Sequence, residues 1–339
     1  MEKYNVVIVG ATGAVGQEIL TILEERDFPL GELRLCATSR SAGKQIIFKG
    51  QEYVVEETTA ESFNGMDIAL FAGGKASLEF GPAAVERGCV VIDNSSNYRM
   101  EPDVPLIVPE VNPDDVKEHK GIIANPNCST IIMTVPLKPI HDAAGIKRVI
   151  VSTYQAVSGA GKEGIEDLTK QATALLNGEE YEAKKFMHQI AFNLIPHIDI
   201  WQEMDYTKEE MKMVKETQKI FHEPDMKITA TTVRVPVYRS HAESINIETE
   251  KKLTQAEVKE LLANTPGIVV QDDPSKDLYP MPVHTSFQNE VFVGRIREDN
   301  SHPSAVNIWV VGDQIRKGAA TNAVQIAELV IKYNCLMEK

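Results

Sequence analysis

Over the first third of the chain, short apolar runs alternate with segments whose apolar residues recur at helical spacing. The predicted strands are Val6–Val9, Leu33–Ala37, Met66–Ala72, Val90–Asp93, Leu106–Val108 and Ile122–Ala124. Helical spacing predicts helices over Gly16–Arg26 and Ser77–Arg87. Strands that alternate with helices are typical of a parallel, doubly wound sheet, so this part is predicted to be an α/β domain.

The pattern changes after about residue 130, where β-branched residues alternate with polar ones, as in a mixed or antiparallel sheet. The predicted strands are Val149–Tyr154, Ile228–Val235, Glu243–Thr249, Val291–Glu298 and Ala305–Val311, and the predicted helices are Gly164–Leu176, Lys208–Phe221 and Gln255–Ala263. We therefore expect a second, α+β domain built on a mixed sheet over residues 130–318. The last predicted helix, Ala319–Tyr333, is expected to return to the first domain, which comprises residues 1–129 and about 319–339.

The composition is that of an ordinary globular protein, with 43 % hydrophobic and 25 % charged residues. The net charge of −14 repels nucleic-acid phosphates and anionic membranes, which argues against both as general partners. The four cysteines show neither CxxC pairing nor metal-ligand spacing, so no metal site is predicted. The N-terminus lacks a signal-peptide layout and no apolar run could span a bilayer, so we expect a cytoplasmic protein with reduced thiols.

A glycine-rich turn, Gly10-Ala-Thr-Gly13-Ala-Val-Gly16, follows the first predicted strand and opens the first predicted helix. Small residues let the backbone approach a pyrophosphate, and the helix N-terminus favours its negative charge. The spacing is GxxGxxG instead of the commoner GxGxxG, and such a turn can also serve packing alone. The strand–turn–helix context favours dinucleotide binding by a Rossmann-type domain.

The residues after the second predicted strand distinguish the two nicotinamide dinucleotides. An NAD site has a carboxylate there, which bonds the ribose 2′-hydroxyl. This chain instead has Ser39, Arg40 and Ser41. A cation and hydroxyls suit a 2′-phosphate, so the predicted cofactor is NADP, and the alternative is a solvated basic loop.

Cys128 stands in a polar, turn-forming segment, Asn125–Thr130, between the strand Ile122–Ala124 and a predicted helix over Ile131–Ile140 that contains two prolines. A lone cysteine is usually a small buried hydrophobe, and Cys36 fits that description. Cys128 differs because ligands bind at the carboxyl ends of such strands, and helix-end amides favour a thiolate. A nucleotide-binding fold with such a cysteine indicates hydride transfer at a carbon that the thiolate has attacked.

Further candidates lie in the second half of the chain. His241 is a candidate general acid/base, since the usual pKa of histidine lies near neutral pH. Arg234 could clamp a carboxylate through paired hydrogen bonds, although arginine at a strand end is common. Arg99 and Lys212 could hold a phosphate, and Lys212 could equally be a solvated charge. Gln155–Gly161 is a second small-residue loop, suited to lie against a cofactor or substrate.

Together these motifs resemble the bacterial-type branch of the aspartate-semialdehyde dehydrogenase family over essentially the whole chain. The matching segments are GATGAVG at Gly10–Gly16, SR at Ser39–Arg40, NPNCST at Asn125–Thr130, QAVSGAG at Gln155–Gly161, YTKEEMKMVKET at Tyr206–Thr217, RVPVYRSH at Arg234–His241 and DQIRKGAATN at Asp313–Asn322. The resemblance implies that Cys128 forms an acyl-thioester and that His241 is the acid/base. It also implies that Gln155 positions the substrate, Arg234 binds its α-carboxylate and Glu209 contacts its amino group.

The resemblance further implies that Arg99 and Lys212 are phosphate ligands. The predicted cofactor contacts are Gly10, Thr12, Gly13, Ala14, Val15, Ser39, Arg40, Ser41, Ser158, Gly159 and Gln314. Gln314 stands where relatives often carry asparagine, and Ser240 stands where glycine more usually precedes the catalytic histidine.

The reaction implied by this family converts L-aspartyl-4-phosphate and NADPH to L-aspartate 4-semialdehyde, NADP and inorganic phosphate. It serves the routes to lysine, diaminopimelate, threonine and methionine, and family members are homodimers or tetramers joined through the second, catalytic and dimerisation domain. The nearest alternative is N-acetyl-γ-glutamyl-phosphate reductase, which shares the fold and the Cys–His chemistry. The RVPV-to-His motif and the QAVSGAG loop favour the aspartyl enzyme.

Two more distant alternatives are weaker. A glyceraldehyde-phosphate-type dehydrogenase usually has an acidic ribose contact for NAD, which this chain lacks. A catalytically inactive, nucleotide-binding homologue is disfavoured because Cys128, Gln155, Arg234 and His241 are all present.

Overall fold

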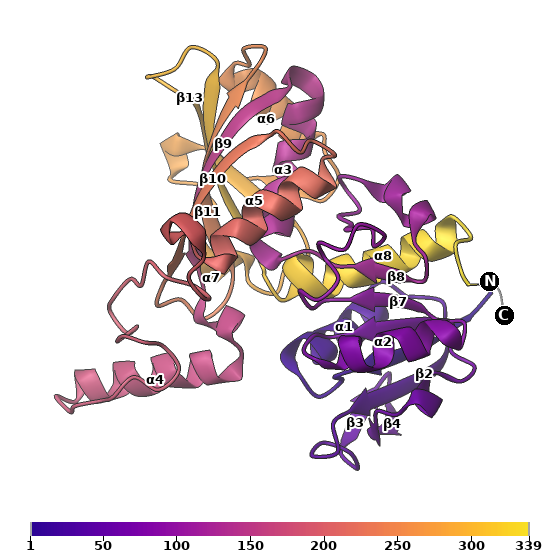
Figure 1. The fold of residues 1–339 in the computed structure, drawn as a ribbon. Coiled ribbons are helices and arrows are strands. Elements are labelled where there is room, and N and C mark those ends of the chain that lie inside the picture. Colours follow the sequence, from indigo (N-terminus) through magenta and orange to yellow (C-terminus); the bar gives the residue numbers. More distant parts are fainter. Residues whose placement is uncertain (1, 338–339) are drawn as a thin grey trace. The chain divides into compact units, whose positions relative to one another are not determined.

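The computed structural model describes residues 2–337, which divide into two compact units (Figure 1). The first comprises the chain up to Asn127, the segment Lys219–Phe221 and the chain from Gly318 onward, and the second comprises Cys128–Gln218 and His222–Lys317. Each unit contains one six-stranded sheet, parallel in the first and mixed in the second, which confirms the predicted fold class. Within residues 2–337, no helix is long and apolar enough to cross a membrane.

The sheet of the first unit has the order β5-β2-β1-β6-β7-β8, and all of its strand pairs are parallel. The strands are β1 (Tyr4–Val9), β2 (Leu30–Ala37), β5 (Glu56–Glu57), β6 (Ile68–Phe71), β7 (Val90–Asp93) and β8 (Ile122–Ala124). The helices of this unit are α1 (Ala14–Glu25), α2 (Ala76–Glu86) and α8 (Thr321–Lys332), with short 3-10 turns at Ala60–Phe63 and Pro113–Glu118.

Alternate residues of these strands belong to different hydrophobic cores. Val6 and Ile8 of β1 pack in a core with residues of α1 and α8. Val7 and Val9 pack in a second core that includes Ala84 of α2. Helices therefore cover both faces of the sheet, which explains why its strands are continuous apolar runs in the sequence.

The predicted strand Leu106–Val108 is wrong, because only one isolated bridge forms there, between Leu106 and Ala124. The Ile107 N–H donates to the Ala124 carbonyl of β8 at 3.2 Å, and asparagine side chains bond three of the other backbone groups. Asn112 accepts from the Val108 N–H at 2.9 Å and donates to the Leu106 carbonyl at 2.9 Å, and Asn322 donates to the Ile107 carbonyl at 2.9 Å. The apolar pattern thus reports burial here, not strand pairing.

The sheet of the second unit has the order β10-β9-β11-β14-β13-β12. The strands are β9 (Ile146–Gln155), β10 (Lys227–Arg234), β11 (His241–Thr249), β12 (Ile268–Val270), β13 (Val291–Glu298) and β14 (Ala305–Gly312). The helices are α3 (Cys128–Ala144), α4 (Lys162–Leu176), α5 (Lys208–Ile220, whose last residues fall in the first unit), α6 (Gln255–Ala263) and α7 (Pro282–Thr285), with 3-10 turns at Val157–Ala160, Glu203–Asp205 and Pro274–Lys276.

One face of this sheet is buried beneath helices. Thr153 of β9 lies opposite Glu243 of β11 and opposite Thr232 of β10, and all three side chains are buried. Helix α3 packs against β9, β11, β13 and β14, and Glu210 of α5 accepts a hydrogen bond from the Thr232 backbone. The other face is only half covered, with Ile150 of β9 exposed.

Several elements depart from the sequence prediction. Helix α3 is longer than the predicted Ile131–Ile140 and begins at Cys128. Helix α8 begins at Thr321 because a π-helical turn, Arg316–Ala320, precedes it. The hairpin of β3 (Gln45–Phe48) and β4 (Gln51–Val54) was not predicted. Its turn residues Lys49 and Gly50 both have positive φ, as in a type I′ turn, but lack the Asn-Gly signal.

Candidate active site

Three predicted site residues meet at one edge of the mixed sheet because of how their strands pair. β9 and β10 are parallel with Gln155 opposite Arg234, so both strands end at the same edge. β11 is antiparallel to β9 with Ala242 opposite Tyr154, so its first residue, His241, lies at that edge too. All three side chains are buried.

Cys128 is the first residue of α3, shortly after β8 ends at Ala124, and its side chain is half-buried. The N–H groups at a helix N-terminus favour a thiolate over a thiol. The charge of Cys128 acts on Arg234, so the two groups lie within electrostatic reach of each other. Burial raises the pKa of Cys36 to about 11, and Cys89 lies in an apolar core, so neither resembles a nucleophile.

His241 is completely buried, and the backbone fixes its tautomer. The Ala156 N–H donates to Nδ1 at 3.1 Å, so the hydrogen of the neutral ring lies on Nε2. Burial lowers the pKa of His241 well below its usual value, and the charge of Arg234 lowers it further. The neutral ring thus presents an N–H donor at Nε2, which has no hydrogen-bond partner among residues 2–337.

Arg234 is a buried cation that the described part of the chain leaves without a carboxylate partner. Its Nη1 donates to the Ala156 carbonyl at 2.6 Å. Burial lowers the pKa of Arg234, while the charges of Glu209 and Cys128 raise it. A guanidinium stays charged, so its remaining N–H groups suit an anionic ligand. Arg239 differs, because its Nε bonds Asp313 at 2.6 Å.

Gly159 lies directly against this pair of side chains. A Cβ at this position would be 2.9 Å from Nη1 of Arg234 and 3.3 Å from Nε2 of His241. Any side chain here would crowd the only donor atom that the His241 ring presents. The glycine therefore keeps the space beside the imidazole open for a ligand.

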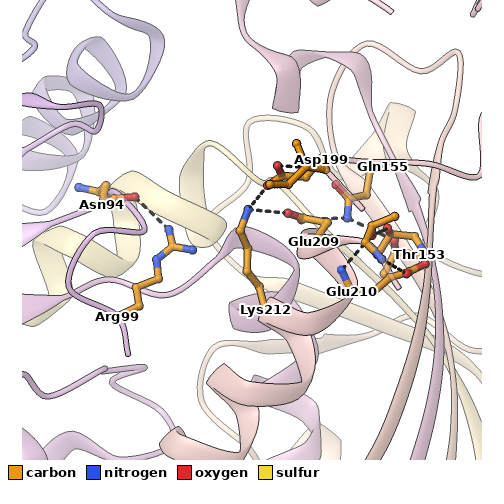
Figure 2. Close-up of polar contacts among 11 residues, drawn as sticks. Asn94, Arg99, Thr153, Gln155, Asp199, Glu209, Glu210 and Lys212 are labelled. Atoms are coloured by element: carbon orange, nitrogen blue, oxygen red, sulfur yellow. Dashed lines mark hydrogen bonds and ion pairs between the residues drawn. The ribbon is translucent and has the colours of Figure 1, made fainter. Parts of the chain in front are cut away.

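A carboxylate–ammonium cluster lies next to Gln155 (Figure 2). Glu209 of α5 accepts from Gln155 Nε2 at 3.2 Å and pairs with Lys212 Nζ at 3.0 Å. Lys212 also pairs with Asp199 at 2.8 Å. Burial alone would lower the pKa of Lys212, but the charge of Glu209 and the hydrogen bond that Lys212 donates to Asp199 outweigh it and raise the pKa.

This cluster bears on two predicted roles. Two carboxylates against one ammonium leave a net negative charge, which suits a cationic group of a ligand at Glu209. Lys212, predicted as a phosphate ligand, is engaged with two carboxylates, although an ammonium has a third N–H to donate.

The side chain of Gln314 joins the loop after β9 to the residue before His241. Its Nε2 donates to Ser158 Oγ at 2.5 Å, and its Oε1 accepts from the Ser240 N–H at 2.9 Å. Ser240 has a φ of 69°, a left-handed conformation that glycine adopts at lower cost. This conformation explains physically why glycine would be favoured at that position.

In the first unit, the β1–α1 turn has the close packing that a dinucleotide site requires. Gly10 has a φ of 88°, and a Cβ on Gly16 would lie 2.3 Å from the Gly10 carbonyl oxygen. Gly13 is the N-cap of α1 and offers no side chain to bond the first N–H groups. Thr12, Ala14 and Val15 lie on this turn and are not fully buried. The turn therefore fits a bound pyrophosphate.

Beside this turn lies a cavity of about 380 Å³ within the first unit. Its lining includes Gly10, Ser39, Glu57 of β5 and the pair Gly73-Gly74, which is followed by Lys75. Arg40 is exposed and has no ion-pair partner in the described part of the chain, and Ser41 Oγ accepts from Lys44 at 3.5 Å. A cavity of this volume beside the glycine-rich turn fits an adenosine nucleotide.

Arg99 belongs to the first unit and is 7 % exposed. Its Nη2 donates to the Asn94 carbonyl at 3.0 Å (Figure 2). Lys219 Nζ donates to three backbone carbonyls of this loop, those of Arg99, Glu101 and Val104, each at 2.8 Å. The loop that carries Arg99 is therefore tightly held.

Sequence reasoning missed three features of these sites. Asp199, which pairs with Lys212, has no sequence signal, because it lies in an irregular segment outside the helix that carries Lys212. The Gly73-Gly74 pair after β6 could have been noticed as another glycine-rich strand end. Glu243, two residues after His241 on β11, could have been noticed as an acidic residue at a buried strand position.

Comparison with known proteins identifies this combination of fold and site. The family model described as semialdehyde dehydrogenase, NAD binding domain, matches residues 5–119, and the model described as semialdehyde dehydrogenase, dimerisation domain, matches residues 137–317. The class of protein is therefore a two-domain oxidoreductase of the semialdehyde dehydrogenase type.

Relatives narrow the class further. Aspartate-semialdehyde dehydrogenase of Aquifex aeolicus is 59 % identical over 334 residues, which cover 97 % of this chain and 98 % of that protein. The structure of aspartate semialdehyde dehydrogenase II from Vibrio cholerae, complexed with ASA, has a TM-score of 0.94 at 49 % identity and covers 98 % of this chain and 99 % of that one. That of Candida albicans with NADP has a TM-score of 0.77 at 28 % identity, covering 99 % and 100 %. The chain belongs to the aspartate-semialdehyde dehydrogenase family.

Proposed function

We propose that this protein reversibly converts L-aspartyl-4-phosphate to L-aspartate 4-semialdehyde with NADPH, through a thioester on Cys128. The observation that carries the proposal is the grouping, within one unit, of Cys128 at a helix N-terminus with buried Arg234 and neutral His241. The reaction would serve the routes to lysine, diaminopimelate, threonine and methionine.

Each side chain has a separate task in the oxidative direction. The Cys128 thiolate attacks the aldehyde carbon, and Nε2–H of His241 donates to the oxygen that becomes negative. When bound, NADP would supply the redox chemistry as the acceptor of the hydride that this carbon loses. Phosphate then attacks the resulting thioester carbonyl, the carbon–sulfur bond breaks, and the Cys128 thiolate leaves.

The substrate is held at both ends. Arg234 binds the α-carboxylate, where paired hydrogen bonds fix its orientation. Glu209 binds the amino group, in keeping with the net negative charge of its cluster. Gln155, which donates to Glu209, positions the reacting carbonyl. Arg99 and Lys212 bind the phosphate.

The cofactor is proposed to be NADP, held by the β1–α1 turn, by Ser39, Arg40 and Ser41, and by Ser158, Gly159 and Gln314. Arg40 is exposed after β2 and has no ion-pair partner among residues 2–337, so it can meet a 2′-phosphate. Glu57 lines the cavity beside the β1–α1 turn, together with Gly10 and Ser39, and is the carboxylate that could instead meet a ribose 2′-hydroxyl. The relative from Candida albicans that was crystallised with NADP supports NADP as the cofactor. The family's dimerisation domain supports a homodimer or tetramer.

Replacing Arg40 with alanine tests the cofactor assignment. If Arg40 meets the 2′-phosphate, the KM for NADPH should rise about tenfold, the effect of losing one charge-assisted hydrogen bond, while the KM for NADH stays nearly constant. Lys44→Ala, in the same exposed loop, is the matched control. Equal effects of Arg40→Ala on both cofactors would reduce Arg40 to a structural role.

Replacing Arg234 with leucine tests the orientation of the substrate. Arg234→Leu should raise the KM for aspartate semialdehyde about 10–100-fold and lower kcat, because a misplaced carbonyl leaves the reactive geometry. Arg99→Ala and Lys212→Ala should instead raise mainly the KM for phosphate. Arg148→Leu, on the exposed side of β9, is the control. The reverse pattern would mean that the substrate binds the other way round.

Steady-state oxidation of competing aldehydes tests the proposed function. The protein should reduce NADP with aspartate semialdehyde far faster than with N-acetylglutamate 5-semialdehyde or glyceraldehyde 3-phosphate. Preference for either of the latter would assign a different reductase activity, and inactivity with all three would indicate a nucleotide-binding homologue without catalysis.

A further inference from the structure

Glu243 is a buried carboxyl group that the proposed mechanism does not use. Its exposed fraction is 0 %, and neither of its oxygens has a hydrogen-bond partner among residues 2–337. It lies two residues after His241 on β11, and alternate residues of a strand point to the same face. Buried carboxyl groups are normally paired or hydrogen-bonded, so an isolated one beside a catalytic candidate requires an explanation.

The neighbouring strands place no charge opposite Glu243. Thr153 of β9 and Val310 of β14 lie opposite it. Gln155 Nε2 donates hydrogen bonds to Thr153 Oγ1 at 3.3 Å and to Glu209 at 3.2 Å. Thr153 and Gln155 therefore connect the position of Glu243 with Glu209.

The charged and titratable groups nearby belong to four elements. β11 carries His241, β10 carries Arg234 and α5 carries Glu209, the group whose charge acts on Glu243. Helix α3, which packs against β11, carries Cys128 at its first residue, while Lys138 and Asp142 near its far end pair with each other at 2.6 Å. Burial, followed by the charge of Glu209, raises the pKa of Glu243 well above its usual value.

We propose that Glu243 is a positioning residue that remains uncharged during turnover, so that Glu209 stays ionised and can recognise the substrate amino group. This role rests on the proposed aspartate-semialdehyde reaction. Two carboxylates in electrostatic reach of each other in a buried site do not readily ionise together.

Ionisation of Glu243 would disturb two groups. It would drive Glu209 towards its protonated form and so weaken binding of the amino group. It would also counteract the effect of Arg234 on His241, two residues away on β11, by favouring the imidazolium. A neutral acid at this position avoids both effects.

Infrared spectroscopy of the full-length protein measures the charge state without relying on activity. Near neutral pH, the wild type should show the carbonyl stretch of a protonated carboxylic acid, and Glu243→Gln should lack it. Glu210→Gln is the matched control. Glu210 is similarly buried, but its oxygens accept backbone N–H groups of Thr207 at 2.7 Å and Thr232 at 3.0 Å, so its loss should leave the band in place.

Kinetics separate positioning from mere packing. Glu243→Gln should keep kcat and the KM for aspartate semialdehyde within about threefold of the wild type near neutral pH, because an amide mimics the neutral acid. On raising the pH, the KM should rise more in the wild type than in Glu243→Gln. Deprotonation of the substrate ammonium group at high pH affects both proteins equally, so it cancels in this comparison.

Two results would overturn the proposal: no protonated band that depends on Glu243, or a loss of activity near neutral pH far beyond threefold in a folded Glu243→Gln. If Glu243→Gln does not fold, the wild type alone still tests the proposal. Its protonated-carboxyl band should be present at neutral pH and should disappear over the pH range in which the KM rises. Absence of this band at neutral pH would reject the proposal. A wild type that does not oxidise aspartate semialdehyde would refute the proposed function but leave the infrared result standing.

Discussion

Replacing Cys128 with alanine is expected to lower kcat by about 10⁴-fold or more, because no other side chain can form the thioester. NADP binding should persist, since the predicted contacts of the cofactor are elsewhere. Turnover and cofactor binding are measured on the same preparation, by absorbance and by fluorescence titration.

Cys335→Ala is the matched control for this substitution. Cys335 is also half-buried, but it lies near the end of the chain, beyond α8. Its variant should retain wild-type turnover. A folded Cys128→Ala protein with wild-type activity would exclude covalent catalysis at this residue.

His241→Asn is expected to lower kcat by about 10²–10⁴-fold, because the reacting oxygen loses its hydrogen-bond donor. The amide oxygen of asparagine can still accept from the Ala156 N–H, so the fold should be retained, while the donor at Nε2 is lost. The kcat and its pH dependence are the quantities to measure.

The sign of the pH effect follows from the burial of His241, which lowers its pKa well below 6.5. The folded protein keeps the ring neutral while the unfolded chain protonates it, so stability is lost as the pH falls below about 6.5. Activity should fall only as the pH approaches the lowered pKa. His241→Asn should remove both acid effects, and an unchanged rate and pH profile would remove His241 from the mechanism.

The sequence predicted best where a single local pattern determines the outcome. Cys128 was expected at a helix N-terminus because a strand, a turn and a helical segment follow one another, and α3 does begin there. The parallel sheet followed from apolar runs that alternate with helices. In the RVPVYRSH segment, Arg234 is the last residue of β10 and His241 is the first residue of β11. Because only a short connection separates them, both residues lie at the same end of the sheet.

The sequence predicted least where side chains distant along the chain bond one another. Lys212 was considered a phosphate ligand or a solvated charge, and its ion pair with Asp199, which lies outside the helix that carries Lys212, was not foreseen. Leu106–Val108 is as apolar as a strand, yet the side chains of Asn112 and Asn322 bond three of its backbone groups. No periodicity contains such information, because it depends on tertiary approach.

The surroundings of buried carboxyl groups were equally beyond the sequence. Glu243 and Glu210 are both glutamates in buried positions, but one has no hydrogen-bond partner in the described residues and the other accepts two backbone N–H groups. Only the folded structure distinguishes these surroundings.

The central claim, an aspartyl thioester on Cys128, is tested most directly by a single-turnover measurement without phosphate. Aspartate semialdehyde and NADP should give a burst of one NADPH per active site, and mass spectrometry should find an aspartyl group on the Cys128 peptide. Adding phosphate should remove that group and start steady turnover. Steady NADPH formation without phosphate, with no modified Cys128 at any time, would contradict the account.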